Sequence, residues 1–124
     1  IDLGEISRES SETRLRSDRA FSQRACYVLL AALQTALDLS SLIIAEEAFP
    51  RPDSYREAFE ILEREGVLRA GPHGAALKEL AGFRNRLVHQ YLRLDWGKVQ
   101  RNLRRVRSAL AAFRSDVARW VRRR

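Results

Sequence analysis

The 124-residue sequence has little cysteine, proline or glycine: one Cys, three Pro and six Gly. So few turn-forming residues argue against both disorder and a loop-rich β-sandwich. The lone Cys26 cannot form an internal disulfide, so we expect a reducing compartment and a core position for this side chain. The apolar run from Cys26 to Leu33 is too short to span a bilayer, and no signal-peptide pattern opens the chain. We therefore expect a cytoplasmic protein without membrane contact.

Several patterns that carry chemistry are also missing. The sequence has no Gly-rich phosphate loop, no CxxC pair and no Ser-centred nucleophile motif. It has two histidines and no run of carboxylates at ligand spacing, so neither a metal site nor a cofactor is expected.

Charge, by contrast, is abundant and unevenly distributed. From Lys98 to Arg124 there are ten Lys or Arg residues and one acidic residue, a net charge of +9, while residues 1–97 carry −2. A one-sided positive field attracts polyanions without specifying a sequence. We expect this segment to bind RNA, although a solvated helix face would have the same composition. The candidate RNA-binding residues are Arg101, Arg104 and Arg105.

A composition of 45% hydrophobic and 31% charged residues, in a chain of this length, is typical of one soluble domain, here residues 1–124. Residues 1–17 are polar and predict only a weak helix or an arm. An apolar stripe predicts a long central helix over about 18–48. Prolines at 50 and 52 end it, and Ser54 with Glu57 forms a capping-box pattern for a short helix that Gly66 should terminate.

Two further helices complete the predicted fold. One begins near Ala75, with an apolar face at Leu77, Leu80, Ala81, Leu87 and Val88. Asp95 can cap the last helix. The apolar seam of that helix is more typical of a core than of a dimerisation strip. The seam comprises Val99, Leu103, Val106, Leu110, Phe113, Val117 and Trp120. The prediction is an all-α, up-and-down bundle of four to five helices, with Tyr27 and Tyr55 as packing residues.

The stretch FRNRLVHQY places four polar side chains near a helix end: Arg84, Asn85, His89 and Tyr91. Histidine can exchange a proton near neutral pH, and an Arg fork can hold a phosphate and stabilise its charge. Asn can fix a phosphate or orient a His ring, so these residue types suit phosphodiester cleavage. Arg and His at a helix end, stabilised by the helix dipole, would look similar. One helix gives only an open strip, whereas two facing strips would enclose a pocket.

The pattern R-N-x-x-x-H-x-Y within GFRNRLVHQY resembles the signature of the HEPN superfamily, and specifically its HepT toxin branch. The segments QTALDLSSLIIAE, SYREAFEILEREGVL and LKELAGFRNRLVHQYLRLD resemble successive family segments. The resemblance implies a homodimeric helical bundle in which both motif copies line a metal-independent endoribonuclease cleft. It implies that His89 is the acid-base residue, that Arg84 binds the scissile phosphate and that Asn85 positions one or both.

The same resemblance implies a partner and a means of control. The partner would be a minimal nucleotidyltransferase antitoxin, MntA, as in the HepT/MntA toxin–antitoxin pairs. It would neutralise the toxin by transferring AMP to Tyr91, which places a bulky anion in the phosphate site. Two alternatives stay open at this point. The chain could be a non-catalytic nucleotide-binding adaptor of a nucleotidyltransferase, or it could bind nucleic acid only through its last helix.

Overall fold

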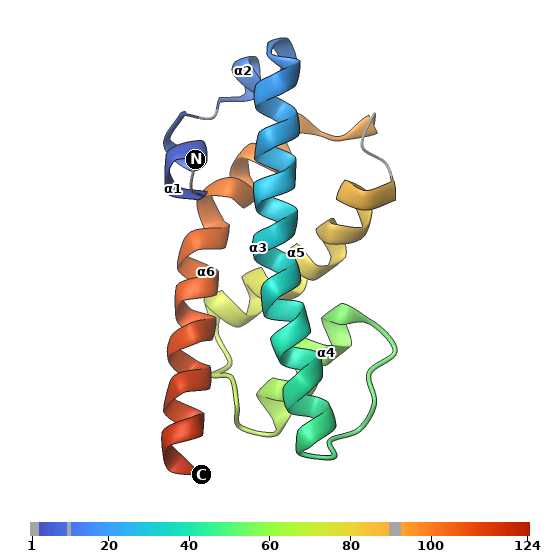
Figure 1. Ribbon diagram of the computed structural model, residues 1–124, viewed down its shortest axis with the longest axis vertical. Helices are drawn as coiled ribbons and strands as arrows, with labels where there is room; N and C mark the ends of the chain where they lie inside the picture. The colour runs from blue at the N-terminus through green and yellow to red at the C-terminus, as the bar shows by residue number, and fades with distance from the viewer. Residues whose placement is uncertain (1–2, 10, 90–92) are drawn as a thin grey trace.

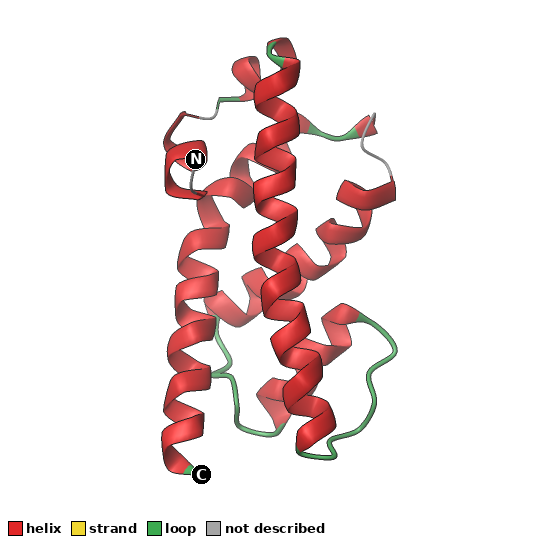
Figure 2. Cartoon of the chain, in the orientation of Figure 1, coloured by secondary structure: helices red, strands yellow, loops and turns green. Residues whose placement is uncertain are grey.

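The computed structural model describes residues 3–9, 11–89 and 93–124, and within these ranges it contains six helices and no strand (Figure 2). The expected all-α fold is confirmed. The helices are α1 (Leu3–Glu9), α2 (Glu12–Ser17), α3 (Arg19–Glu46), α4 (Tyr55–Arg64), α5 (Pro72–His89) and α6 (Trp96–Arg123). The last four are the main helices.

Two 28-residue helices, α3 and α6, follow the long axis of the molecule, and α5 crosses it obliquely (Figure 1). An aspartate caps the start of each of the two long helices, α3 and α6. Asp18 accepts a hydrogen bond from the Phe21 backbone N–H at 3.0 Å. Asp95 accepts from the backbone N–H groups of Gly97 and Lys98 at 3.0 and 3.2 Å. These caps satisfy N–H groups that have no partner inside the helix.

The short helix α4 has the predicted boundaries. The Ser54 hydroxyl accepts from the Glu57 backbone N–H at 3.0 Å. After the helix, Gly66 has a φ of 79°, a left-handed conformation that glycine adopts without strain. The Val67 backbone N–H then donates to the Leu62 carbonyl at 2.9 Å, and Val67 and Leu68 turn back into the core.

Contacts between α4 and α5 set the start of α5. Lys78 forms an ion pair with Glu63 of α4 at 3.2 Å, and both side chains are largely buried. A Cβ at Gly74 would meet the Glu63 carboxylate, so the Glu63 side chain would have to shift to accommodate it. The start of α5 thus packs closely against α4.

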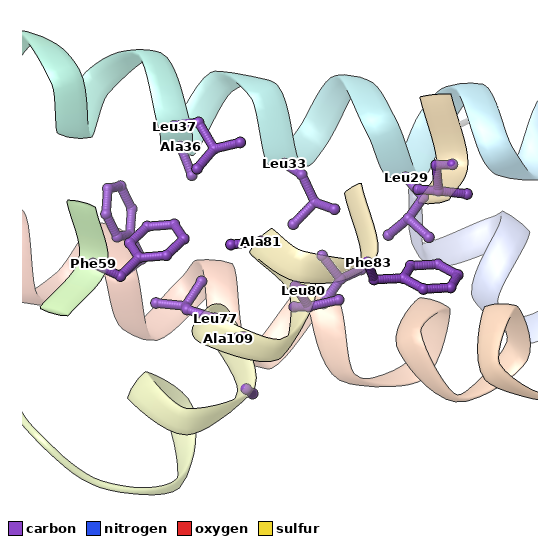
Figure 3. Packing of buried hydrophobic residues seen from close by; sticks show 14 of the residues in the cluster. Leu29, Leu33, Ala36, Leu37, Phe59, Leu77, Leu80, Ala81, Phe83 and Ala109 are labelled. Carbon is purple, nitrogen blue, oxygen red and sulfur yellow. The ribbon is translucent and has the colours of Figure 1, made fainter. Parts of the chain in front are cut away.

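The core lies between α3, α5 and α6, with α4 closing one end (Figure 3). Leu29, Leu33 and Leu37 of α3 face Leu77 and Leu80 of α5, and all five are at most 2% exposed. The rings of Phe59 and Phe113 meet edge to face at 6.0 Å, which joins α4 to α6. The predicted α6 seam is core: five of its residues are buried and two pack partly buried against the cluster. Cys26 is buried, as predicted.

The structure decides one local expectation and corrects two others. Of the weak helix or arm predicted at the N-terminus, residues 3–9 and 12–17 form helices, and α1 and α2 bury Ile6 and Leu15 and pack against α3 and α6. Tyr27 was predicted to pack, but it is 72% exposed because it lies about 200° around the helix from the buried Leu29. Val88 was placed on the apolar face of α5, yet it is 43% exposed, since that face instead runs through Phe83 and Leu87.

The length and apolar composition of helix α3 are relevant to the prediction that the protein does not contact a membrane. Over Arg19–Glu46 it is long and apolar enough to cross a bilayer by length and composition, whereas the shorter run considered above is not. The core helix of a bundle passes the same test. In this fold its buried stripe packs against every other helix, from α1 to α6. That packing is what a core helix requires.

Candidate functional site

The final two turns of α5 carry the predicted polar strip, which we define as Arg84, Asn85 and His89. Arg84 is half-buried, and Asn85 and His89 are exposed. Tyr91 lies outside the described residues. Within one copy the strip is spread around the helix, since Arg84 and His89 are five positions apart, or about 140° on an ideal helix.

Arg84 is held in one orientation by residues of three helices. Its Nε and Nη2 donate to Oε1 of Gln34 on α3 at 3.2 and 3.1 Å, and its Nη1 donates to Oδ1 of Asn85 at 3.3 Å. Its guanidinium carbon lies 4.9 Å from the centroid of the Tyr55 ring at the start of α4. Asp38 in turn accepts from Nε2 of Gln34 at 2.9 Å, which turns the Gln34 oxygen toward Arg84. A network anchored on α3 therefore aims this guanidinium.

The acceptors around Arg84 are neutral amides, so its positive charge is not compensated. No carboxylate lies within ion-pair distance of Arg84 in the described part of the chain. An Arg side chain has about five N–H donors. Three of the donors of Arg84 are used in the contacts above, which leaves the others for a ligand. This is a pre-oriented cation suited to a phosphate.

Sequence reasoning missed the residues that position Arg84. Gln34 stands out only as a polar residue in a helix predicted to be largely buried, and Tyr55 was interpreted as a packing residue. Tyr55 is half-buried and does pack against the core, but its ring also contacts Arg84. The polar side chain inside an apolar helix was the one available signal.

A cavity of about 710 Å³ adjoins the strip. It is lined by the C-terminal part of α3, the connection from α3 to α4, the first residues of α4 and Asn85 of α5. Asn85 is the strip residue that faces it, and Tyr55 forms part of its wall.

The basic flank of α6, which we define as Arg101, Arg104 and Arg105, contains arginines that differ in exposure and in ion pairing. Arg101 and Arg104 are exposed. Nη1 of Arg105 lies 2.6 Å from Oε2 of Glu79 on α5, and this hydrogen bond and ion pair lower the pKa of the Glu79 carboxyl. One of the three predicted RNA-binding arginines is thus already paired with a carboxylate.

The remaining candidates for reactive or metal-binding groups are the Cys26 thiol, the carboxylates and His73. Burial raises the pKa of the Cys26 thiol to about 11, so it is protonated at neutral pH and is not a nucleophile. Among the residues that the structure describes, no three His, Cys, Asp or Glu side chains gather closely enough to hold a metal ion. His73, the second histidine, lies in the first turn of α5, far along the helix from His89.

The chain belongs to the HepT-like ribonuclease family: the family described as "Ribonuclease HepT-like" matches residues 1–117. The resemblance to the HepT branch of the HEPN superfamily is thereby confirmed. The chain is 30% identical over 87 residues to a protein of Archaeoglobus fulgidus provisionally named as an RNase. That match covers 70% of this chain and 64% of the relative, so the chain spans somewhat less than two thirds of that protein.

Solved structures share the fold. The cytosolic protein YutE of Bacillus subtilis, of unknown function, superposes with a TM-score of 0.80 at 23% identity over 96% of this chain and 80% of its own. A toxin–antitoxin crystal structure with AMP-PNP gives 0.72 at 19% identity. A tri-AMPylated HEPN toxin of Shewanella oneidensis, in complex with an MNT antitoxin, gives 0.71 at 20% identity. The last two each cover 91% of this chain and 86% of their own. At these identities the likeness concerns the fold alone.

Proposed function

We propose that this chain is a metal-independent endoribonuclease and the toxin of a toxin–antitoxin pair. The observation that carries the proposal is the uncompensated Arg84 guanidinium, held beside Asn85 one turn before His89, in a member of the HepT-like ribonuclease family. The residue set supplies a cation for the phosphate and a group that exchanges protons near neutral pH. These are the requirements of phosphodiester cleavage by an adjacent hydroxyl.

In the proposed reaction the 2′-OH of one ribose attacks the neighbouring phosphorus, and the bond from phosphorus to the 5′-oxygen of the next nucleotide breaks. His89 exchanges the proton with the attacking or leaving oxygen. Arg84 stabilises the charge that develops on the phosphate oxygens, and Asn85 orients the phosphate or the imidazole. The products are a 2′,3′-cyclic phosphate and a free 5′-OH, so no metal ion, cofactor or water enters this step.

The proposed active form is a homodimer. Because one strip is spread around α5, a single copy leaves the phosphate exposed on one side, and a second copy would enclose it. Mixing Arg84→Ala with His89→Ala protein tests this arrangement. If the two copies form one cleft, mixed dimers regain part of the RNA cleavage that each variant lacks alone. No recovery, with subunit exchange verified, would mean that each copy acts independently.

The proposed partner is an MntA-like nucleotidyltransferase antitoxin in the cytoplasm. In this scheme the Tyr91 oxygen bonds to the α-phosphorus of ATP, pyrophosphate leaves and the phenol proton is released. The attached AMP then repels RNA by charge and by bulk. The structure named for the Shewanella oneidensis toxin, which is AMPylated and bound to an MNT antitoxin, supports this scheme. Intact mass after incubation with such a partner and ATP should rise by AMP, and Tyr91→Phe should prevent the rise.

The decisive experiment is RNA cleavage by purified protein in the presence of a chelator. We expect cleavage to persist and the products to carry 2′,3′-cyclic phosphate and 5′-OH ends. Loss of activity in the chelator would refute metal independence. Absence of cleavage under all conditions, with partner binding intact, would instead indicate the non-catalytic adaptor.

A further inference from the structure

The cavity beside the strip has a mixed lining, of which the proposed phosphate chemistry uses Asn85 alone. Part of the lining, which we call the floor, is apolar: Ile44, Ala45 and Phe49 near the end of α3 and Ala58 of α4. Polar groups stand around it: Ser41, Arg51, Asp53 and Asn85. At about 710 Å³ it lies within the size range of small-molecule sites.

The cavity and the strip are physically continuous. Asn85 belongs to both, since its Oδ1 accepts from Arg84 while the residue lines the cavity. Tyr55 is the second connection, because its ring contacts the Arg84 guanidinium and also lines the cavity. Figure 2 shows the α3–α4 connection, in green, on the same side of the molecule as the C-terminal half of α5. A phosphate on Arg84 would therefore stand at the edge of this cavity.

The charges in the lining disfavour a second phosphate. Arg51 and Asp53 both line the cavity and together carry no net charge. Neither side chain has a hydrogen-bond or ion-pair partner within the described ranges, so the guanidinium donors and carboxylate acceptors are both available. A neutral, flat ligand with an apolar face and a rim of donors and acceptors matches such a lining. A nucleobase has these properties.

We propose that this cavity is a base-binding subsite for a nucleotide next to the scissile phosphate. The inference rests on the proposed ribonuclease function and extends it, since it identifies where the enzyme contacts the base of its substrate. Tyr55 and the apolar floor contact the base, and Arg51, Asp53 and Asn85 contact its edge. The strip then handles the phosphate of the same nucleotide.

A cavity-filling variant tests the subsite without altering the strip. Ser41→Phe places a ring into the cavity from an exposed position on α3. Ala31→Phe is the matched control, because it adds the same ring to an exposed position of α3 that does not line the cavity. The substrates are oligodeoxynucleotides that contain a single ribonucleotide with A, C, G or U as its base, since cleavage needs that one 2′-OH. The second probe is binding of the four nucleoside 3′-monophosphates, which carry the phosphate at the position of the scissile group, with ribose 3-phosphate as the base-free control.

We expect Ser41→Phe to raise KM roughly tenfold, as loss of one stacked base would, and to reduce the differences in cleavage among the four bases. It should abolish the tighter binding of the 3′-monophosphates over ribose 3-phosphate, and Ala31→Phe should match the wild type. An unchanged KM in Ser41→Phe would overturn the subsite. Loss of monophosphate binding without any change in cleavage would also overturn it, because the cavity would then serve a free nucleotide.

Two further outcomes separate the subsite from the function on which it rests. Wild-type protein that cleaves none of the four oligonucleotides would refute the ribonuclease, and with it the subsite. A change in oligomeric state in Ser41→Phe alone would overturn the subsite while the nuclease stands, since the cavity would then be a contact between subunits.

Discussion

Two arginine-bearing regions of this molecule differ in how their charges are held. In the strip, Arg84 is half-buried and oriented by Gln34, Asn85 and Tyr55, none of which carries a negative charge. On the α6 flank, Arg101 and Arg104 are exposed, and Arg105 is paired with Glu79. An oriented cation can recognise the geometry of one phosphate, whereas a mobile or neutralised one adds only to the surrounding field. Composition alone would have ranked the flank first, because it has more arginines.

The largest predicted effect is in the strip, at His89. His89→Ala should reduce RNA cleavage by roughly 10²- to 10⁴-fold, the usual contribution of a general acid or base. Its stability should stay unchanged, because His89 is exposed at the end of α5. Cleavage rates and thermal unfolding together measure this. His73→Ala is the control, since it removes the other exposed histidine of the same helix. Equal losses in the two variants would refute a specific role for His89.

The second prediction concerns the neutral surroundings of Arg84. Gln34→Glu keeps the size and the acceptor that Arg84 contacts, adds a negative charge beside the guanidinium and replaces the Nε2 group that donates to Asp38. The new carboxylate competes with RNA phosphate, so we expect kcat/KM to fall about tenfold, equivalent to about 1.4 kcal/mol. Gln23→Glu changes the net charge equally at an exposed position of α3 and should have little effect. If both variants behave alike, Arg84 does not depend on neutral acceptors.

The third prediction tests the flank. Replacing both Arg101 and Arg104 with Gln should weaken RNA binding several-fold at low salt and make its salt dependence less steep by about 1.4 in the log–log slope. Turnover at saturating RNA should stay close to wild type, because we propose that the flank increases encounter with RNA and does not orient the phosphate. Binding titrations at several salt concentrations measure the slope. A loss of kcat would place these arginines in the reaction itself.

Local features of the fold were predictable from the sequence. Helix starts at Ser54 and Asp95, and the stop at Gly66, depend on interactions within a few residues, so the sequence pattern identifies them. The α6 seam was equally clear because its spacing persists over the whole helix. The N-terminal prediction, a weak helix or an arm, left open what the structure resolves as helices, because Ile6 and Leu15 are isolated apolar residues and only the assembled bundle buries them.

The features that distinguish the two arginine regions were not predictable. Gln34 and Arg84 are 50 positions apart, and their contact depends on how α3 crosses α5. Glu79 and Arg105 are 26 positions apart and meet only because α5 packs against α6. The sequence therefore indicates which residue types could carry the proposed chemistry. Whether each cation is free, oriented or neutralised follows from helix packing.

The smallest predicted effect tests whether Glu79 neutralises Arg105 on the flank. Glu79→Gln removes the carboxylate that neutralises Arg105, so RNA affinity should rise about twofold at low salt, and the gain should disappear as salt screens the flank. Because Arg105 lowers the pKa of the Glu79 carboxyl, the pair persists to a lower pH than an unpaired Glu carboxyl would allow, and it is lost as pH falls through that lowered pKa. A rise in affinity from protonation of Glu79 should therefore come at a lower pH than an unpaired Glu would give. Glu65→Gln makes the same change in net charge at an exposed position of the α4–α5 turn. An equal gain in Glu65→Gln would show that net charge alone, rather than the release of Arg105, controls RNA binding at the flank.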